Sequence, residues 1–297
     1  MRIVRLTRQS AALAAAGGVV AMGFLGPAVA STTDGRPLGT HQGVRAPAVA
    51  AHAQERPQLP SGEHYVCPAP ARAGQMACMS IIRTAAALGV NAPSPSFTNG
   101  SYGPSALRSA YKLTKASKTG GRGRLVAIVD AFNDPNAARD LARYRAHYHL
   151  PPCSTTSGCL KIVNEHGQKG PLPGAKANWA VEESLDLDMV SAICPHCHIL
   201  LVEATRPSTV DLGTAVDTAV AMDAKYVSNS WSGGEFVGQD FFDHFFNHPG
   251  VVVDFASGDL GYGPQYPTDL QFVTAVGGTS LRHASGAWLD RVRLGPE

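Results

Sequence analysis

Short apolar runs recur along the chain from residue 104 onward, separated by longer stretches with a helical period. The runs cover residues 125–129, 160–163, 199–202, 226–228, 251–255 and 272–276. The stretches near 135–147, 177–193, 209–223 and 238–246 are long enough for amphipathic helices. A continuous β-branched run is typical of a strand buried on both faces. The alternation therefore predicts an α/β fold with a doubly wound parallel sheet.

The residues before 104 differ from the rest in composition and in apolar pattern. Residues 31 to about 60 are rich in Gly, Pro, Ala and Ser and lack apolar periodicity, which favours a linker or short leader. Residues 61–101 give no clear element. A proline near the first turn then predicts a helix over 104–111. We expect a linker or leader region over 31–101, with one disulfide, and a main domain over 102–297.

The extreme N-terminus indicates export. Three arginines precede an apolar run over residues 11–25, and Ala28-Val29-Ala30 provides the small residues that a signal peptidase needs. A membrane anchor is the alternative, but the run is shorter than the roughly 20 apolar residues that span a bilayer, and three glycines interrupt it. We therefore predict a signal peptide over 1–30 and a secreted, extracellular protein.

Composition and charge exclude several classes of function. A chain of 297 residues with 44% hydrophobic and 16% charged residues can bury a large core, which argues against a disordered or fibrous protein. The net charge of +2 is too small to indicate a nucleic-acid groove or an anionic membrane surface as partner. No nucleic acid and no membrane partner is expected, and the protein is expected to be a monomer.

The six cysteines fall into three local pairs along the sequence, Cys67 with Cys78, Cys153 with Cys159, and Cys194 with Cys197, and their connectivity stays open. An even number is typical of an oxidising compartment. The stretch 194–198 also contains two histidines and admits a zinc interpretation. A structural zinc site generally needs four ligands, and no second pair of suitable spacing follows, so a disulfide is favoured there.

Two carboxylates share one stripe of the predicted helix over 177–193. At 100° per residue, Glu182 and Asp186 fall on the same side as Met189 and Ile193. Like charges at this spacing repel, and a carboxylate turned toward a core loses solvation, so local stability does not explain the pair. Two such groups share a proton, which suits general acid/base chemistry below neutral pH.

A less specific interpretation of this pair stays open. Glu182 and Asp186 could lie at a wet rim and form ion pairs with Lys176 or Arg206. Glu183 and Asp188 lie off the stripe, and we expect both of them in solvent.

Two loops after predicted strands also contain candidate groups. Asp259 lies in a glycine-flanked turn after the run 251–255, where it could approach a substrate or simply cap the turn. The segment 228–234, Ser-Asn-Ser-Trp-Ser-Gly-Gly, follows another strand. Its small residues leave a backbone edge to which an extended peptide could add as a strand, although loop punctuation gives the same composition.

Taken in order, these segments resemble the sedolisin (serine-carboxyl) peptidase family, endopeptidases with a subtilisin-like fold that act in acid. The resemblance covers about residues 103–281. It rests on Gly103-Pro104 with 107–111, Glu182-x-x-Leu185-Asp186 followed by Ile193-Cys194-Pro195, Ser230-Trp231-Ser232, Ala256-Ser257-Gly258-Asp259, and Val273-Thr274-Ala275-Val276-Gly277-Gly278-Thr279-Ser280.

The resemblance implies roles for individual residues. Glu182 is the general base toward a nucleophilic serine, and Asp186 orients it and shares its proton. Asp259 is protonated and donates to the developing oxyanion. Ser230, Trp231 and Gly233 line the peptide cleft, so peptides or proteins are the expected substrates.

The chain departs from the family after Asp259. The family's serine lies downstream in Gly-Thr-Ser-x-x-x-Pro, and no such motif follows at the expected distance. Gly278-Thr279-Ser280 lacks the proline. We therefore expect a member that lacks its C-terminal part, with the catalytic serine missing. Calcium is expected for the complete family domain, but its ligands come from that missing part.

Two other interpretations remain. One is an ordinary subtilisin with Asp130 and His166 as triad members, which also lacks a nucleophile. The other is a non-catalytic secreted protein that binds peptides in a peptidase-like cleft.

Overall fold

A computed structural model describes residues 56–83, 102–261, 263–284 and 287–292 of the chain. These residues all belong to one compact unit, Ala48–Glu297. The predicted signal peptide over 1–30 lies outside the described residues and stays a prediction. Within the described part of the chain, no helix is long and apolar enough to cross a membrane.

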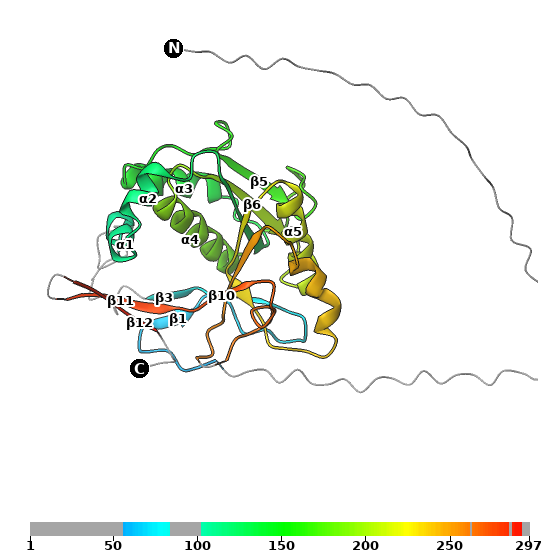
Figure 1. Cartoon of the computed structure of the whole chain (residues 1–297). Coiled ribbons are helices and arrows are strands. Elements are labelled where there is room, and N and C mark those ends of the chain that lie inside the picture. Colours follow the sequence, from blue (N-terminus) through cyan, green and yellow to red (C-terminus); the bar gives the residue numbers. More distant parts are fainter. Residues whose placement is uncertain (1–55, 84–101, 262, 285–286, 293–297) are drawn as a thin grey trace, which may run out of the picture. The chain divides into compact units, whose positions relative to one another are not determined.

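A six-stranded parallel sheet forms the centre of this unit (Figure 1). Its strand order is β10-β9-β7-β4-β6-β5, and every neighbouring pair is parallel. The strands are β4 (Leu125–Ala131), β5 (Leu160–Asn164), β6 (His198–Ala204), β7 (Tyr226–Asn229), β9 (Val252–Ala256) and β10 (Thr274–Val276). Each coincides with one of the apolar runs, which confirms the parallel α/β sheet predicted from the sequence.

Helices lie on both faces of the sheet. Alternate residues of β4 enter two separate cores: Ala127 and Val129 join one cluster, and Ile128 joins the other. The first cluster includes residues of α5 (Thr209–Ala221) and η1 (Gln239–Phe246), and the second includes residues of α3 (Ala137–His147) and α4 (Ala177–Ile193). This arrangement is doubly wound, as predicted. Because side chains alternate along a strand, Asp130 faces α4, on the same side as Ile128.

The first helices and the last strands complete the fold. Helix α1 (Pro104–Ala110) confirms the proline-led helix and is followed by α2 (Thr114–Thr119). The segment 238–246 is a 3₁₀ rather than an α-helix. After β10, strands β11 (Thr279–Ala284) and β12 (Ala287–Val292) form an antiparallel hairpin that the apolar pattern did not predict.

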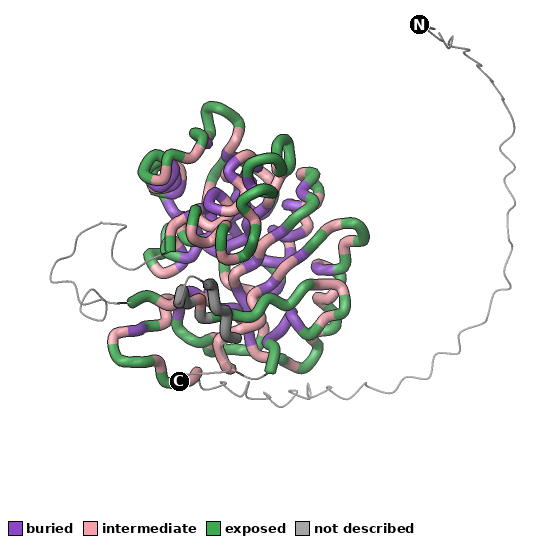
Figure 2. Tube along the Cα trace, turned by 60° about the vertical axis from the view of Figure 1, so that its left-hand side comes forward, coloured by how far each residue is buried: buried purple, intermediate pink, exposed green. Residues whose placement is uncertain are grey.

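Part of the sheet stays open on one face. Tyr226 of β7 and Val252 of β9 are paired neighbours and are each 43% exposed. Val276 on the edge strand β10 is 52% exposed. Buried residues lie along the central strands and on the helix faces turned toward them (Figure 2). No described helix covers these three apolar side chains.

Residues 56–83, which we call the strap, pack against the main core. Within the strap, β1 (Glu63–Tyr65) pairs antiparallel with β3 (Ile81–Arg83). Between them, β2 (Ala77–Cys78) pairs antiparallel with β8 (Trp231–Ser232), which follows β7. Cys67, Met76 and Cys78 belong to the same buried cluster as Trp231. The sequence analysis assigned no element to this region.

All three predicted disulfides are present: Cys67–Cys78, Cys153–Cys159 and Cys194–Cys197. The last of them uses the two sulfurs on which the zinc interpretation depended. The described residues contain no free cysteine. The structure thus gives the connectivity that the sequence left open, and each bond joins cysteines that are neighbours along the sequence.

Candidate active site

Helix α4 places Glu182 and Asp186 together in a buried position, as its stripe of residues predicted. An Oε2 atom of Glu182 accepts a hydrogen bond of 2.7 Å from the backbone N–H of Ser80 in the strap. Asp186 accepts a bond of 2.8 Å at Oδ1 from the hydroxyl of Ser230. The two acids therefore lie between the strap and the end of β7.

Burial controls the electrostatics of this pair. Loss of solvation raises the pKa of Glu182 to about 7, although its hydrogen bonds from Ser80 partly oppose the shift. Burial and the neighbouring charge of Glu182 raise the pKa of Asp186, which the Ser230 hydroxyl partly offsets. With two coupled acids of raised pKa, the pair retains a proton under mildly acid conditions and can exchange it.

Asp259 belongs to the same electrostatic group. Its charge contributes to the raised pKa of Glu182. Burial raises the pKa of Asp259 itself to about 6, against the opposing charge of Arg56 in the strap. Its Oδ2 atom is buried without a hydrogen-bond partner among the described residues. A protonated Asp259 thus has a proton to donate to another oxygen at this position.

The turn that presents Asp259 depends on Gly258. This glycine has φ of 103°, a backbone conformation that side chains disfavour. A Cβ at this position would approach the Oε1 atom of Gln265 to 2.2 Å. The glycine before the acid therefore permits a close approach of two loops, which is a stronger requirement than simple turn capping.

The prediction that Glu183 and Asp188 lie in solvent is wrong. Glu183 is fully buried and accepts a bond of 3.1 Å from the Asp134 N–H, and burial raises its pKa to about 10. Asp188 is half-buried, and burial raises its pKa to about 8. Helix α4 contacts α1 and α3 as well as the sheet, so its buried surface is wider than one stripe.

The sequence analysis did not include two further buried acids in this group of carboxylates. Asp130 of β4 and Glu203 of β6 are paired neighbours in the sheet, and both are fully buried with neither oxygen hydrogen-bonded among the described residues. Burial and the charges of nearby acids, with Asp186 first among them, raise the pKa of Asp130. The sequence did contain a signal for Asp130. An acid that directly follows an apolar run belongs to the same buried strand, so its side chain faces the core.

The structure does not support the subtilisin interpretation based on Asp130 and His166. The His166 side chain is 64% exposed and lies 3.6 Å from the Glu165 carboxylate. Asp130 accepts no hydrogen bond from His166 or from any other described residue.

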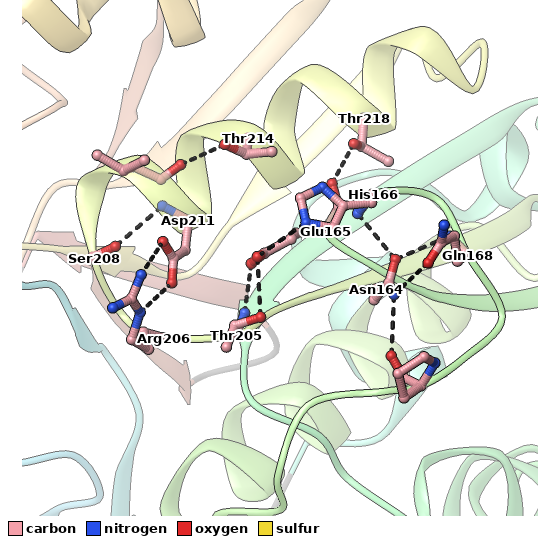
Figure 3. A network of polar contacts seen from close by, with 12 residues as sticks. Asn164, Glu165, His166, Gln168, Thr205, Arg206, Ser208, Asp211, Thr214 and Thr218 are labelled. Atoms are coloured by element: carbon pink, nitrogen blue, oxygen red, sulfur yellow. Dashed lines mark hydrogen bonds and ion pairs between the residues drawn. The ribbon is translucent and has the colours of Figure 1, made fainter.

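The interpretation of Glu182 and Asp186 as rim residues paired with a cation is wrong. Arg206 forms an ion pair of 2.7 Å with Asp211 instead, within a separate polar network around Glu165 (Figure 3). The Lys176 ammonium lies over the ring of Phe132, 5.8 Å from its centroid. Neither cation neutralises the two buried acids.

The segment 230–233, which follows β7, contributes a backbone edge to the candidate site rather than a set of side chains. The Trp231 side chain is fully buried and donates a bond of 2.9 Å from Nε1 to the Val129 carbonyl, and the Trp231 backbone pairs with Cys78 of β2. Ser230 binds Asp186. A Cβ on Gly233 would approach the Gln75 carbonyl oxygen of the strap to 2.5 Å. Gly233 therefore lies at a close contact between backbones.

Neither a nucleophile nor a metal site is identified among the described residues. Ser280 lies in strand β11 rather than at the start of a helix. Among the described residues, no group of three or more His, Cys, Asp or Glu is arranged to hold a metal ion. Calcium, expected only for the complete family domain, stays a prediction.

No family model matches the chain, and no curated protein matches it. Solved structures are similar in part. Pseudomonas sedolisin, a serine-carboxyl proteinase, is 17% identical over 63% of this chain and 56% of its own, with a TM-score of 0.49. Fervidolysin from Fervidobacterium pennivorans, a keratinolytic enzyme related to subtilisin, is 17% identical over 65% of this chain and 29% of its own (TM-score 0.41). The PatG macrocyclase domain is 15% identical over 56% of this chain and 60% of its own (TM-score 0.35).

These likenesses concern the arrangement of strands and helices. The chain spans little more than half the length of the sedolisin structure. The basis for assigning an activity is therefore the group of Glu182, Asp186 and Asp259 together with the edge of β8 (Trp231–Ser232).

Proposed function

We propose that the chain belongs to a secreted serine-carboxyl endopeptidase of the sedolisin type, which hydrolyses peptide bonds in acid. The observation that carries the proposal is the association of Glu182, Asp186 and Asp259, from one helix and one loop, beside the edge of β8. Active sites of open α/β sheets lie at the carboxyl ends of the strands, where Asp259 and Ser230 are found.

In this proposal Glu182 is the general base. Its pKa near 7 makes it a better proton acceptor than an ordinary carboxylate once it is ionised. Asp186, held by the Ser230 hydroxyl, orients Glu182 and shares its proton. Ser280, which lies in strand β11, is not the serine whose proton Glu182 accepts in this scheme.

Asp259 stabilises the oxyanion in the same scheme. A carboxyl group donates a hydrogen bond only while it is protonated, and the raised pKa of about 6 keeps Asp259 protonated in mild acid. Ionisation above that pH removes the donor and places a negative charge next to the developing oxyanion. Activity should therefore fall as the pH rises through 6.

The gene provides the first test. Sequencing through codon 297 and several hundred bases beyond it should reveal a downstream Gly-Thr-Ser-x-x-x-Pro motif, in this frame or a neighbouring one. The polypeptide that includes this motif should cleave an internally quenched peptide faster at pH 6 than at pH 8, because Asp259 donates a hydrogen bond only while it is protonated. Cleavage should also fall toward pH 4, because Glu182 accepts a proton only when it is ionised. Residues 31–297 alone should show no serine-dependent cleavage. Acid cleavage by residues 31–297 that Ser280→Ala abolishes contradicts the assignment.

Substitutions in the longer polypeptide test the individual roles. Glu182→Gln, Asp186→Asn and Asp259→Asn should each lower kcat/KM by about 100-fold or more, because each removes a proton acceptor or donor needed in the transition state. Asp240→Asn, which changes an exposed carboxylate of η1, is the matched control and should leave kcat/KM within about twofold. Equal losses in Asp240→Asn and Glu182→Gln contradict the proposed roles.

A non-catalytic peptide-binding protein is the second candidate. The observation that favours it is that β8 already pairs with an extended segment, the strand β2. Peptide binding without cleavage, by the gene product at its full natural length, supports this candidate over the peptidase.

A further inference from the structure

Residues 102–129 contain lysines and arginines but neither aspartate nor glutamate. Their cations outnumber the net charge of +2 of the whole chain, so the other residues together carry a net negative charge. One of these cations, Arg108, is half-buried and donates a bond of 2.5 Å from Nε to the Ala192 carbonyl near the end of α4. The others are exposed, and we call them the basic face: Lys112, Lys115, Lys118, Arg122 and Arg124.

The cations of the basic face are not neutralised by acids of the protein. Within the described ranges, none of them forms an ion pair. Other exposed arginines do find an acid, as Arg206 does in Asp211. Like charges close together repel one another, so this arrangement does not stabilise the fold. Its charge is available to a partner of opposite sign.

The backbone that carries the basic face is fixed to the core at two points. The Ser117 hydroxyl of α2 donates a hydrogen bond to the carbonyl of Ile193, the last residue of α4. Gly121 lies directly against the Cys194–Cys197 disulfide, because a Cβ at this glycine would approach one of the two sulfurs to 2.2 Å. A surface that is held in place in this way loses less conformational freedom when it binds a partner.

The basic face and the candidate catalytic acids lie at opposite ends of the central sheet. Arg124 immediately precedes β4, and Asp130 lies near the carboxyl end of the same strand. A strand of this length spans roughly 20 Å. Ser230 and Asp259 also follow the carboxyl ends of their strands. A partner on the basic face therefore does not obstruct the carboxylates.

The spacing and type of these cations fit a linear polymer of phosphate groups. Lys115 and Lys118 are three positions apart in α2, which places their Cβ atoms about 5–6 Å apart on one side of the helix. Cations at this spacing can contact neighbouring phosphates of an extended strand. The planar guanidinium groups of Arg122 and Arg124 can each bind two phosphate oxygens. A polymer of carboxylates fits less well, because it loses charge in acid.

An anionic lipid surface fits this part of the molecule less well. Segments that lie in a membrane interface combine basic residues with large apolar side chains that insert among the lipids. Over residues 102–124, the exposed large apolar side chains are those of Tyr102 and Tyr111, and no aliphatic side chain is among them. The basic face therefore has the charge for a lipid surface but lacks the side chains that would insert.

We propose that the basic face binds a linear phosphate polymer and tethers the protein to it, at the end of the sheet away from the carboxylates. This role goes beyond the proposed peptidase function and does not depend on it, because neither the acids nor a serine takes part. It predicts that binding is electrostatic and depends on the cations of the basic face.

Fluorescence anisotropy of the full chain with labelled long-chain inorganic polyphosphate measures the binding. If every cation of the basic face contacts a phosphate, the affinity should fall about 100-fold between 50 and 200 mM NaCl, a slope of about −3.5 in logarithmic units. Lys115→Gln/Lys118→Gln should bind about tenfold more weakly or worse, and its salt slope should be smaller by about 1.4. Should this variant fail to fold, Arg122→Gln/Arg124→Gln provides the same test.

Arg72→Gln/Lys169→Gln is the matched control. It removes the same charge at two exposed positions outside the basic face. Its affinity for polyphosphate and its salt slope should equal those of the wild type. An equal loss of affinity in this control and in Lys115→Gln/Lys118→Gln overturns the proposal, because binding then follows the net charge and not the basic face. Absence of binding by the wild type at about 50 mM NaCl overturns it as well.

Two other probes separate a phosphate polymer from other anionic partners. One is a single-stranded oligonucleotide with the same number of phosphates, and the other is a vesicle of phosphatidylglycerol. We expect the oligonucleotide to bind no more tightly than polyphosphate and the vesicle to bind more weakly. Tighter binding of the oligonucleotide indicates recognition of bases, and tighter binding of the vesicle indicates a lipid partner. Either result overturns the proposal and leaves the peptidase function untouched.

Discussion

Raising the pH from 4 to 8 should lower the melting temperature of the protein by about 10 °C or more. Buried acids cause this loss, and burial raises the pKa values of Glu182, Glu203 and Glu183 to about 7, about 8 and about 10. Their pKa values exceed those of the unfolded chain, so the folded state binds more protons. The stabilisation is fully present below pH ~4.5 and is lost as the pH rises through the folded pKa values.

The expected size follows from these values. One pKa unit corresponds to about 1.4 kcal/mol, so Glu182 and Glu203 alone contribute on the order of 8 kcal/mol between pH 4 and 8. Thermal unfolding followed by circular dichroism, with the disulfides intact, measures the effect. Glu203→Gln should flatten the dependence on pH, whereas Asp240→Asn, at an exposed position, should leave it unchanged. A melting temperature that is constant or rises over this range contradicts the burial of these acids as protonated groups.

Trp231→Ala should lower the free energy of unfolding by about 3–5 kcal/mol. The indole is fully buried and packs edge-on against Phe255, with the ring centroids 4.8 Å apart. It also contacts Phe246, and its N–H satisfies the Val129 carbonyl in the central strand. The truncation leaves a cavity and an unpaired carbonyl, and it loosens the strand that pairs with the strap.

Urea denaturation measures this loss. Phe241→Ala is the matched control, because the Phe241 ring is 82% exposed and its removal should change stability by no more than about 0.5 kcal/mol. Trp231→Phe should fall between the two, since it keeps most of the packing but loses the hydrogen bond. Equal stability of Trp231→Ala and Phe241→Ala contradicts the assignment of Trp231 to the core.

The apolar pattern predicted the central sheet because its strands are buried on both faces and read as continuous runs. It also brought Glu182 and Asp186 together, since the helical period alone places them on one side of α4. The apolar pattern could not show how much of the α4 surface is buried. Glu183 is buried because α4 is covered by neighbouring helices as well as by the sheet, and no local period encodes the number of neighbours.

The strap shows a different limit of sequence analysis. Strands of two or three residues, such as Ala77–Cys78, are too short to give a period of two. Their pairing partner lies more than 150 residues away at Trp231–Ser232. The Cys67–Cys78 spacing predicted the disulfide but could not show that the loop it closes lies on Glu182. The occupation of the candidate site is thus a long-range property of the fold.

Glu182 should retain its proton in mild acid next to Asp186, and infrared difference spectroscopy measures this protonation state. The spectrum of Glu182→Gln is subtracted from that of the wild type between pH 4 and 9, to isolate the protonated carboxyl band of Glu182. We predict a band that is present at pH 5 and fades with a midpoint near pH 7. Complete ionisation of Glu182 by pH 5 contradicts the raised pKa that burial gives this carboxyl.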